Sequence, residues 1–362
     1  MQIIKDRRAL HQIPELDRNL PKTMAYLINS LEALDCYVFS PMEGALCAYF
    51  DFGAEKTIAF RSDADALPIT ERANHNYAST HPGQMHACGH DGHMSIALEL
   101  ARRLNGKQGM RRNVLILFQP AEETTGGAKD LCDTGIFTLY NVEAIFGLHL
   151  WPGVEAGGIY SRANEMMSRS CEVKLVVTGK SAHIAKAYEG VDAMSAGVEF
   201  YQKARALERA LPEHVYRILN FGKFHSGTVC NAVAGEAMIH GSLRAFQDDI
   251  FFSLQDGLKQ IAEEIAANTG CKMELSLGSG YPAVMNPPVL YEKVRGMVDF
   301  CELEAPSMIT EDFSWYQRTV PGLFFFLGTG NSPALHSDNF DFPEEILVSG
   351  ADFFEKIAEA FA

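Results

Sequence analysis

Four short apolar runs, separated by stretches with helical spacing, restrict the possible fold more than any other feature of the sequence. The runs are TIAFR (57–61), VLILFQ (114–119), AIFGLHL (144–150) and LFFFLG (323–328), each about the length of one buried strand. MSIALELARRL (94–104) and SGADFFEKIAEAF (349–361) read as helices. Buried strands that alternate with helices are typical of a mostly parallel sheet covered on both faces. The sequence therefore predicts an α/β fold with a mixed, mostly parallel sheet.

The middle of the chain follows a different pattern. It predicts six elements in order. They are a half-exposed strand CEVKLVVTG (171–179), a helix at about 190–211, the strands VYRILNFGKF (215–224) and EAMIHGSLRAF (236–246), a helix at about 248–268 and a last strand KMELSLG (272–278). This β-α-β-β-α-β order is the ferredoxin-like arrangement. We therefore expect an α+β domain at residues 168–280, inserted into an α/β domain made of residues 1–167 and 281–362.

Metal-binding side chains follow the ends of the predicted parallel strands. Because ligands of open α/β sheets bind at the carboxyl ends of strands, these residues are expected to converge. They are Asp63 and Asp65 after the first strand, Glu122 and Glu123 after the second, His149 in the third, His336 after the fourth, and Cys88 and His90 in QMHACGHDGH (84–93) before the helix. Each alone has an ordinary structural explanation, such as a turn cap, a solvated acidic pair or a buried thiol. Together they predict a metal site.

The remaining histidines are not expected to bind the metal. His86 and His93 are interpreted as supporting groups or as polar residues at the helix terminus. Nothing in the sequence places the others near the site, and they are interpreted as structural: His11, His75, His81, His214 and His240.

The types of ligand indicate the chemistry. Imidazole, carboxylate and thiolate together suit zinc, and a carboxylate-rich site also suits manganese or cobalt. Two neighbouring ions would use about this many ligands and hold a water between them, and coordination lowers the pKa of water from 15.7 to about 7. One of two adjacent glutamates can then bind metal while the other faces the water. We assign Glu123 to the metal and Glu122 to general base and acid.

Composition excludes several classes of partner. The formal net charge is −15 and Lys and Arg form no clusters beyond pairs, which argues against nucleic acid. No apolar run is long enough for a membrane span, and MQIIKDRRAL lacks the pattern of a signal peptide. Eight cysteines without a C-x-x-C pair are interpreted as buried thiols rather than a disulfide framework. The sequence thus predicts a cytoplasmic protein that binds neither nucleic acid nor membrane.

Seven motifs, in this order, resemble one family of metal-dependent amidohydrolases: RSDADALPI, MHACGHDGH, FQPAEETTGGA, GLHLWP, GKSAH, TEDF and LHS. That family includes aminoacylases, hippurate hydrolases, auxin-conjugate hydrolases and N-acetyldiaminopimelate deacetylases. The resemblance implies a two-metal peptidase-like catalytic domain with an inserted ferredoxin-like lid domain. It implies two divalent ions (Zn, Mn, Co or Ni), Glu122 as the catalytic acid–base and Asp65 as a group that orients a ligand. The implied ligands are Cys88, His90, Glu123, His149 and His336.

The resemblance also extends to the middle domain. His183 in GKSAH resembles a histidine that often reaches the site of a neighbouring subunit and polarises the scissile carbonyl, which implies a homodimer. Asn231 and Arg244 resemble residues that bind the carboxylate of the substrate, a role suited to a guanidinium fork. The sequence departs from the family at Ala187 and Tyr188, where many relatives have Pro-His. This change concerns the pocket and therefore the choice of substrate.

The expected activity is hydrolysis of an N-acyl-L-amino acid by metal-bound hydroxide, with N-acetyldiaminopimelate favoured by MSIALEL and GTVCNAV. A dipeptidase or carboxypeptidase with the same residues is the nearest alternative, because the sequence does not separate acyl from aminoacyl groups. A non-catalytic protein with a structural or sensing metal is a third reading. Glu122 argues against that reading, because a structural zinc site is closed by four ligands and needs no base.

Overall fold

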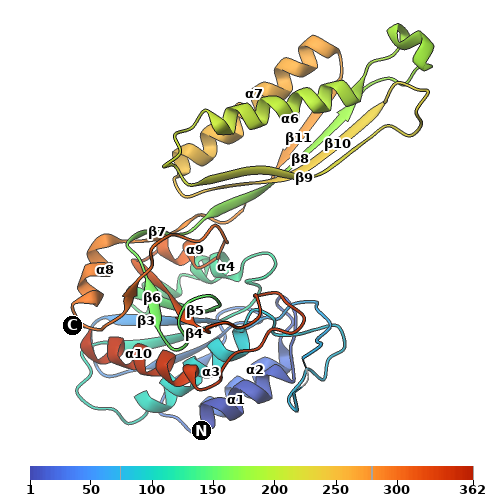
Figure 1. Ribbon diagram of the computed structural model, residues 1–362. Coiled ribbons are helices and arrows are strands. Elements are labelled where there is room, and N and C mark those ends of the chain that lie inside the picture. Colours follow the sequence, from blue (N-terminus) through green and yellow to red (C-terminus); the bar gives the residue numbers. More distant parts are fainter. Residues whose placement is uncertain (74, 279, 362) are drawn as a thin grey trace. The chain divides into compact units, whose positions relative to one another are not determined.

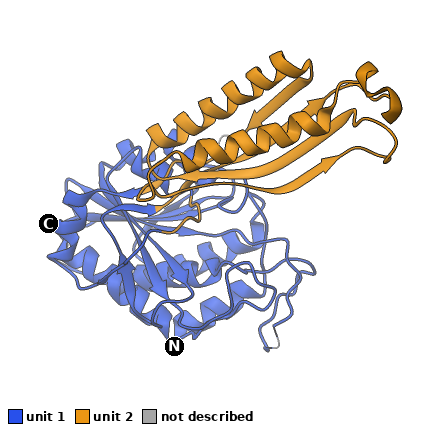
Figure 2. Cartoon of the chain, turned by 45° about the horizontal axis from the view of Figure 1, so that its top comes forward, with its two compact units in different colours: residues 1–166, 285–306, 312–362 blue, residues 167–284, 307–311 orange. Residues whose placement is uncertain are grey.

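The computed structural model describes residues 1–73, 75–278 and 280–361, which form two compact units (Figure 2). Unit 1 comprises residues 1–166, 285–306 and 312–362, and unit 2 comprises residues 167–284 and 307–311. The sequence placed residues 167, 281–284 and 307–311 in the first domain, and the structure places them in unit 2. The segment 307–311 belongs to unit 2 because its carbonyl groups accept hydrogen bonds there: the Ser168 N–H donates to Ser307 O and Ile309 O, each at 3.0 Å.

Unit 1 is an α/β unit (Figure 1). Its helices are α1 (Gln2–His11), α2 (Pro21–Leu31), α3 (His90–Leu104), α4 (Gly127–Asp133), α5 (Ile136–Leu139), α8 (Pro288–Arg295), α9 (Ser314–Gln317) and α10 (Ile346–Ala360). Its main strands are β1 (Tyr37–Phe39), β2 (Leu46–Phe50), β3 (Thr57–Asp63), β4 (Asn113–Gln119), β5 (Val142–Trp151), β6 (Ile159–Ser161), β13 (Cys301–Glu302) and β14 (Gly322–Gly328). Two short strands that pair with each other, β7 (Asn164–Met167) and β12 (Val284–Asn286), lie where the chain passes between the units.

These strands form an eight-stranded sheet in the order β1-β2-β4-β3-β5-β14-β6-β13. The four central strands, β4, β3, β5 and β14, are parallel, as the four apolar runs predicted. Towards the edges, β1, β2 and β6 run antiparallel to their inner neighbours. The predicted mixed, mostly parallel sheet is therefore confirmed, and the sequence missed only its short outer strands.

Alternate side chains of the central strands pack against two helical layers. Phe60 of β3 and Phe325 of β14 belong to the larger core and contact Phe354 and Phe353 of α10, with ring centroids 4.9 and 4.8 Å apart. On the other face, Phe324 packs against Phe313, just before α9. Figure 1 shows α1, α3 and α10 on one side of the sheet and α4 and α9 on the other. Burial of every residue of β3, β4 and β14 follows from this arrangement.

Unit 2 has the predicted β-α-β-β-α-β order. Its elements are β8 (Arg169–Thr178), the short 3₁₀ helix η1 (Ile184–Glu189), α6 (Ala193–Arg209), β9 (Arg217–Ser226), β10 (Glu236–Ala245), α7 (Asp248–Thr269) and β11 (Lys272–Leu277). The antiparallel sheet has the order β11-β8-β10-β9. Asp192 caps α6 by accepting from the N–H groups of Met194 and Ser195, and Gly270 ends α7 in the left-handed conformation.

All eight cysteines are free thiols, as predicted. The prediction that they are buried was wrong for Cys230 and Cys301, which are exposed. Both lie outside the two hydrophobic cores, so no packing excludes solvent from them. Among the described residues, no helix combines the length and apolar character needed to cross a bilayer.

Candidate metal centre

The predicted ligands of unit 1 gather at the carboxyl ends of the parallel strands. Cys88 and His90 lie at the start of α3, on either side of Gly89, which has φ +87°. A Cβ on Gly89 would lie 2.8 Å from Leu150 Cδ1 of β5. Glycine therefore satisfies two demands here, a left-handed turn into the helix and a close approach to β5. That turn places one thiol and one imidazole together at the sheet edge.

His90 and His149 each turn the Nε2 atom of the ring toward the site. His90 Nδ1 lies 2.8 Å from Asp65 O, and His149 Nδ1 lies 2.7 Å from Leu150 O. A carbonyl oxygen only accepts, so both Nδ1 atoms carry hydrogen and both Nε2 atoms could bind a metal ion. His90 Nε2 is buried without a hydrogen-bond partner in the described part of the chain, and His149 Nε2 lies 3.4 Å from Cys88 Sγ.

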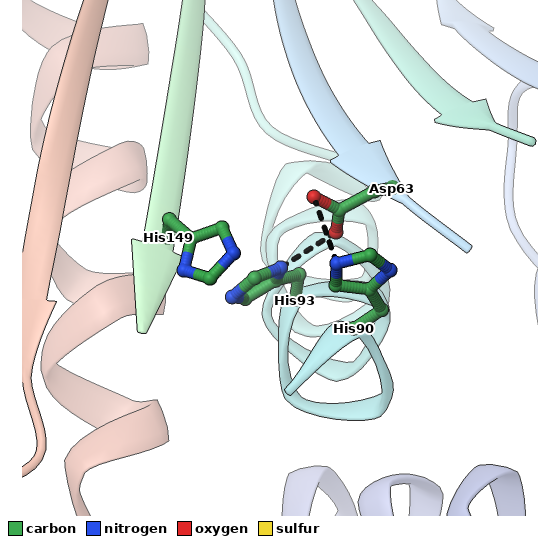
Figure 3. Close-up of side chains that lie close together, drawn as sticks. All are labelled: Asp63, His90, His93 and His149. Atoms are coloured by element: carbon green, nitrogen blue, oxygen red, sulfur yellow. Dashed lines mark hydrogen bonds and ion pairs between the residues drawn. The ribbon is translucent and has the colours of Figure 1, made fainter. Parts of the chain in front are cut away.

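His93, which the sequence left as a supporting group, has no nitrogen available for a metal. Its Nδ1 lies 2.6 Å from Asp63 Oδ1, and its Nε2 accepts the Leu150 N–H at 2.9 Å. Figure 3 shows His90 and His93 rising from α3 toward Asp63, with His149 opposite on β5. His93 therefore holds Asp63 against β5, and Asp63 Oδ2 lies 3.6 Å from His90 Nε2. Asp63 was expected among the converging residues but not among the ligands that the resemblance implies, and the structure places its carboxylate in this part of the site.

Asp65 fixes the two adjacent glutamates through their backbone. Its Oδ1 accepts the Glu122 N–H at 3.0 Å and its Oδ2 accepts the Glu123 N–H at 3.1 Å. The preceding residue, Ala121, has φ +60°, a conformation that costs a non-glycine residue about 1–3 kcal/mol. Asp65 is thus buried at a point where it holds the backbone of both glutamates.

Glu123 and His336 complete the cluster. Glu123 Oε1 lies 3.2 Å from His336 Nε2 and 3.8 Å from His90 Nε2. His336 has φ +64°, and its N–H donates to Ala87 O at 2.8 Å. That backbone bond holds His336 beside the Cys88 turn, although its side chain is 52% exposed. The donor atoms of Cys88, Glu123 and His336 all lie within 4.8 Å of one another.

The pKa values of Cys88 and His90 are shifted by burial and by the surrounding carboxylates. Burial and the carboxylates of Glu123 and Glu122 raise the pKa of the Cys88 thiol well above its usual value. Burial lowers the pKa of His90, but Asp63, Asp65 and Glu123 outweigh it and raise that pKa to about 10. A buried group of thiol, carboxylates and imidazoles is satisfied by a positive ion.

The donor set fits two divalent ions. Donor atoms fall into overlapping groups, each within 4.8 Å: Asp63, His90 and His149 (with His93), then His90, Glu122 and Glu123, then Cys88, Glu123 and His336. His90 and Glu123 belong to two groups each, so the groups adjoin. Sulfur, nitrogen and oxygen donors together are typical of zinc-like ions.

A buried network of hydrogen bonds and ion pairs, which was not expected from the sequence, contacts the site through Asp63. Arg61 Nη1 lies 2.8 Å from Asp63 Oδ2, and Arg61 Nη2 lies 2.9 Å from Asp312 Oδ1. Gln119 donates to both oxygens of Asp312 and accepts from Arg61 Nε and the Tyr316 hydroxyl. Arg61 is a charged residue inside the otherwise apolar run TIAFR, directly before Ser62 and Asp63. A basic residue in a strand expected to be buried was the available signal.

The predicted residues of unit 2 lie in two places. His183 forms a bridge with Ala232, and Asn231 O accepts the Ile184 N–H at 2.9 Å, so His183 and Asn231 are neighbours. His183 Nδ1 accepts the Ala185 N–H at 3.2 Å, which leaves the hydrogen on Nε2 of the exposed ring. Arg244 lies near the far end of β10, where its Nη1 donates to Met308 O at 2.5 Å.

Comparison with known proteins identifies the family of the chain. The model of peptidase family M20/M25/M40 matches residues 59–360. An N-acetyldiaminopimelate deacetylase from Streptococcus suis is 35% identical over 364 residues, covering 97% of each chain. An uncharacterised hydrolase from Staphylococcus haemolyticus is 32% identical over 370 residues, covering 98% of this chain and 97% of the relative.

Solved structures show the same fold over nearly the whole chain. A putative aminohydrolase from methicillin-resistant Staphylococcus aureus superposes with a TM-score of 0.90 at 28% identity, covering 98% of this chain and 95% of the other. The Bacillus subtilis YXEP protein, described as a dinuclear metal-binding peptidase of family M20, gives 0.84 at 27% identity, covering 99% and 96%. The expected resemblance is confirmed: the chain belongs to peptidase family M20/M25/M40 and is a hydrolase of amide bonds.

Proposed function

We propose that the protein removes the acyl group from N-acyl-L-amino acids, with N-acetyldiaminopimelate as the first candidate substrate. The observation that carries this proposal is the pair Glu122–Glu123, held at the sheet edge by the two oxygens of Asp65 beside the metal-binding donors. The similarity to N-acetyldiaminopimelate deacetylases, at 35% identity over 97% of both chains, supports the choice of substrate.

We assign two divalent ions, zinc, manganese, cobalt or nickel, to Cys88, His90, Glu123, His149 and His336. When bound, such ions polarise a carbonyl oxygen and lower the pKa of water. Asp63 and His93 act on this set indirectly. Asp63 faces His90 Nε2, and His93 fixes Asp63 to the backbone of Leu150.

Glu122 moves the proton. Its carboxylate accepts a proton from the attacking water as the new C–O bond forms. It then delivers that proton to the amide nitrogen, so the C–N bond breaks and a neutral amine departs. One positioned general acid–base contributes roughly 10²–10⁴-fold in rate. Asp65 acts as the positioning residue, because it holds the backbone N–H groups of Glu122 and Glu123 without reaching the substrate itself.

Unit 2 supplies the groups that recognise the substrate. His183 presents Nε2–H as a donor to the oxygen of the scissile carbonyl, and such a donor contributes about 3–4 kcal/mol. Arg244 and Asn231 bind the carboxylate of the amino acid. The eight residue steps from Glu236 to Arg244 along β10 span about 26 Å at strand geometry. His183 and Asn231 lie beyond the Glu236 end, so a single copy of unit 2 holds these groups too far apart for one small substrate.

This separation supports a homodimer in which each site uses Arg244 from one copy and His183 from the other. Unit 2 also has a surface suited to pairing. Strand β9 is an edge of its sheet in the described residues, and exposed edges favour pairing with another chain. The exposed side chains of Met194, Val198 and Tyr201 follow one face of α6, and Phe224 is exposed on β9. An apolar face of this kind favours association.

We further propose that the protein acts in the cytoplasm on a small-molecule substrate, without nucleic acid or membrane partners. All eight cysteines are free, as expected in a reducing compartment. The net charge of −15 disfavours binding to phosphate backbones.

Release of free amine tests the activity. The protein is freed of metal with a chelator, then supplied with manganese, cobalt or zinc and given N-acetyldiaminopimelate, acetyl- and benzoyl-amino acids, and dipeptides. Metal-dependent turnover of the acyl-amino acids is the expected result. Turnover of dipeptides alone would instead identify a dipeptidase, and no turnover with metal bound would contradict the proposal.

Mixed dimers test the shared site. His183→Ala and Glu122→Gln chains are each inactive, but a refolded 1:1 mixture is expected to recover about a quarter of wild-type activity. Half of the dimers would then be mixed, and each mixed dimer would contain one complete site. If His183 acted within its own chain, both sites of a mixed dimer would be defective and no activity would return.

A further inference from the structure

Three side chains outside the proposed catalytic centre form a second cluster of metal-ligand type. His11 ends α1, and Glu71 and His75 lie in the segment between β3 and α3. One nitrogen of each histidine and one oxygen of Glu71 lie within 4.8 Å of one another. We propose that His11, Glu71 and His75 form a third metal site, for one zinc-like divalent ion. From the sequence alone, both histidines were expected to be structural.

Glu71 is oriented for this role. Its Oε2 accepts the Ser79 N–H at 2.6 Å, which fixes the carboxylate plane. Its Oε1 then lies 3.1 Å from His11 Nε2 and 3.0 Å from His75 Nε2. Ligand atoms arranged tetrahedrally about 2.0–2.1 Å from a zinc ion are roughly 3.3 Å apart. The observed separations differ from that spacing by only a few tenths of an ångström.

His11 has the support that metal-binding histidines usually have. Its Nδ1 lies 2.9 Å from Asp91 Oδ2, and the guanidinium of Arg7 holds the same oxygen at 2.9 Å. A carboxylate on one ring nitrogen fixes the tautomer and directs the lone pair of the other nitrogen toward the metal. His11 is fully buried, and its Nε2 faces Glu71 Oε1.

His75 distinguishes this cluster from an ordinary ion-pair network. Both of its ring nitrogens are buried without a hydrogen-bond partner in the described chain. Its Nε2 lies 3.0 Å from Glu71 Oε1 but is not aligned for a hydrogen bond. The ring stacks on Tyr77, with centroids 3.8 Å apart and planes 15° apart, so its orientation is fixed. A protonated His11 would satisfy Asp91 and Glu71 but would leave His75 unpaired. An ion satisfies all three ligands.

The ligand types select the metal class. Two imidazoles and one carboxylate form the set that zinc uses where a fourth position is open to water. The His75 side chain is 13% exposed, which provides a path for an ion from solvent. A bound ion would join the end of α1 to the segment that precedes α3. Asp91, whose carboxylate contacts His11, directly follows His90 on α3. Asp91 therefore connects the third site to the catalytic centre.

Zinc content per chain tests the proposal. The protein is loaded with Zn²⁺, freed of weakly held ions by brief chelation and measured by plasma mass spectrometry against protein concentration. Wild type is expected to hold three ions, and His75→Asn one ion fewer. His214→Asn, which changes an exposed histidine of unit 2, is the matched control and should equal wild type. The Zn²⁺-induced rise in Tm should also shrink in His75→Asn only.

Each outcome decides the question. A wild-type chain that holds only two ions would overturn the proposal, as would a His75→Asn chain with the same content as wild type. If His75→Asn does not fold, Glu71→Gln is measured in the same way and should also lose one ion. A His149→Asn chain, altered at the catalytic centre, should still hold the ion at the third site.

Discussion

Replacing Asp65 with asparagine tests how the two glutamates are held. Asparagine keeps one acceptor oxygen but puts an amide N–H₂ where the second backbone N–H now donates. One hydrogen bond to a charged group, about 1.5–3 kcal/mol, is lost. If that loss fell entirely on the transition state, it would correspond to a decrease of roughly 10- to 150-fold in turnover. The expected result is a fall in kcat of about 10- to 100-fold.

The assay separates positioning from binding and from stability. Steady-state kinetics on an acyl-amino acid should show the loss in kcat with little change in KM, because Asp65 does not reach the substrate. Metal content and Tm are measured on the same sample. Asp35→Asn, an exposed change of equal charge, should behave as wild type. A value of kcat for Asp65→Asn within twofold of wild type, with metal bound, would refute the positioning role.

Three further perturbations follow from the structure. Phe60→Ala removes a ring that lies fully buried against α10 and should lower the free energy of unfolding by about 3–5 kcal/mol. Urea titration measures this change, and a loss below about 1 kcal/mol would contradict the packing. Gly89→Ala should reduce metal content at the catalytic centre, because its Cβ would meet Leu150 Cδ1 at 2.8 Å and its φ is +87°. Unchanged metal content would contradict the need for glycine in this turn. Burial raises the pKa of Cys132 to about 11, so the thiolate is scarce at neutral pH and its alkylation should accelerate about tenfold per pH unit up to that pKa. Exposed Cys230 should react faster at pH 8, and equal rates there by mass spectrometry would contradict the burial of Cys132.

The sequence was enough to predict which residues gather at one edge of the sheet because the strands are short, apolar and parallel. Parallel strands bring their carboxyl ends to one edge, so residues that follow β3 and β4, and one inside β5, meet without any knowledge of loops. Glu123 and His149 were expected at this edge for that reason, and the structure places both there. The order of elements in unit 2 followed from the same reasoning on hydrophobic alternation.

Loop geometry could not be predicted in the same way. His336 reaches Glu123 because its own φ is +64° and its N–H bonds to Ala87 O, and neither feature has a local signal in TGNSPALHS. The role of His93 depends on two partners, Asp63 and Leu150, that are 30 and 57 positions away in the sequence. Hydrogen bonds between residues far apart in the sequence decide whether a histidine nitrogen is available to a metal ion.

The cluster of His11, Glu71 and His75 also could not be predicted from the sequence. The three residues are separated by 60 and 4 positions, and only the packing of α1 beside the 71–79 segment brings His11 to the other two. The convergence of parallel strand ends does not predict this cluster, because none of its residues directly follows a parallel strand.

The central claim is that Glu122 transfers the proton during amide hydrolysis. The most direct test is the rate of N-acetyldiaminopimelate hydrolysis by Glu122→Gln at full metal content, beside wild type and the exposed control Glu32→Gln. Glutamine keeps the side-chain size and the backbone N–H bond to Asp65 but cannot accept the proton. The account predicts a loss of at least about 10²–10⁴-fold in kcat with metal content unchanged. Turnover within tenfold of wild type, with metal bound, would contradict it.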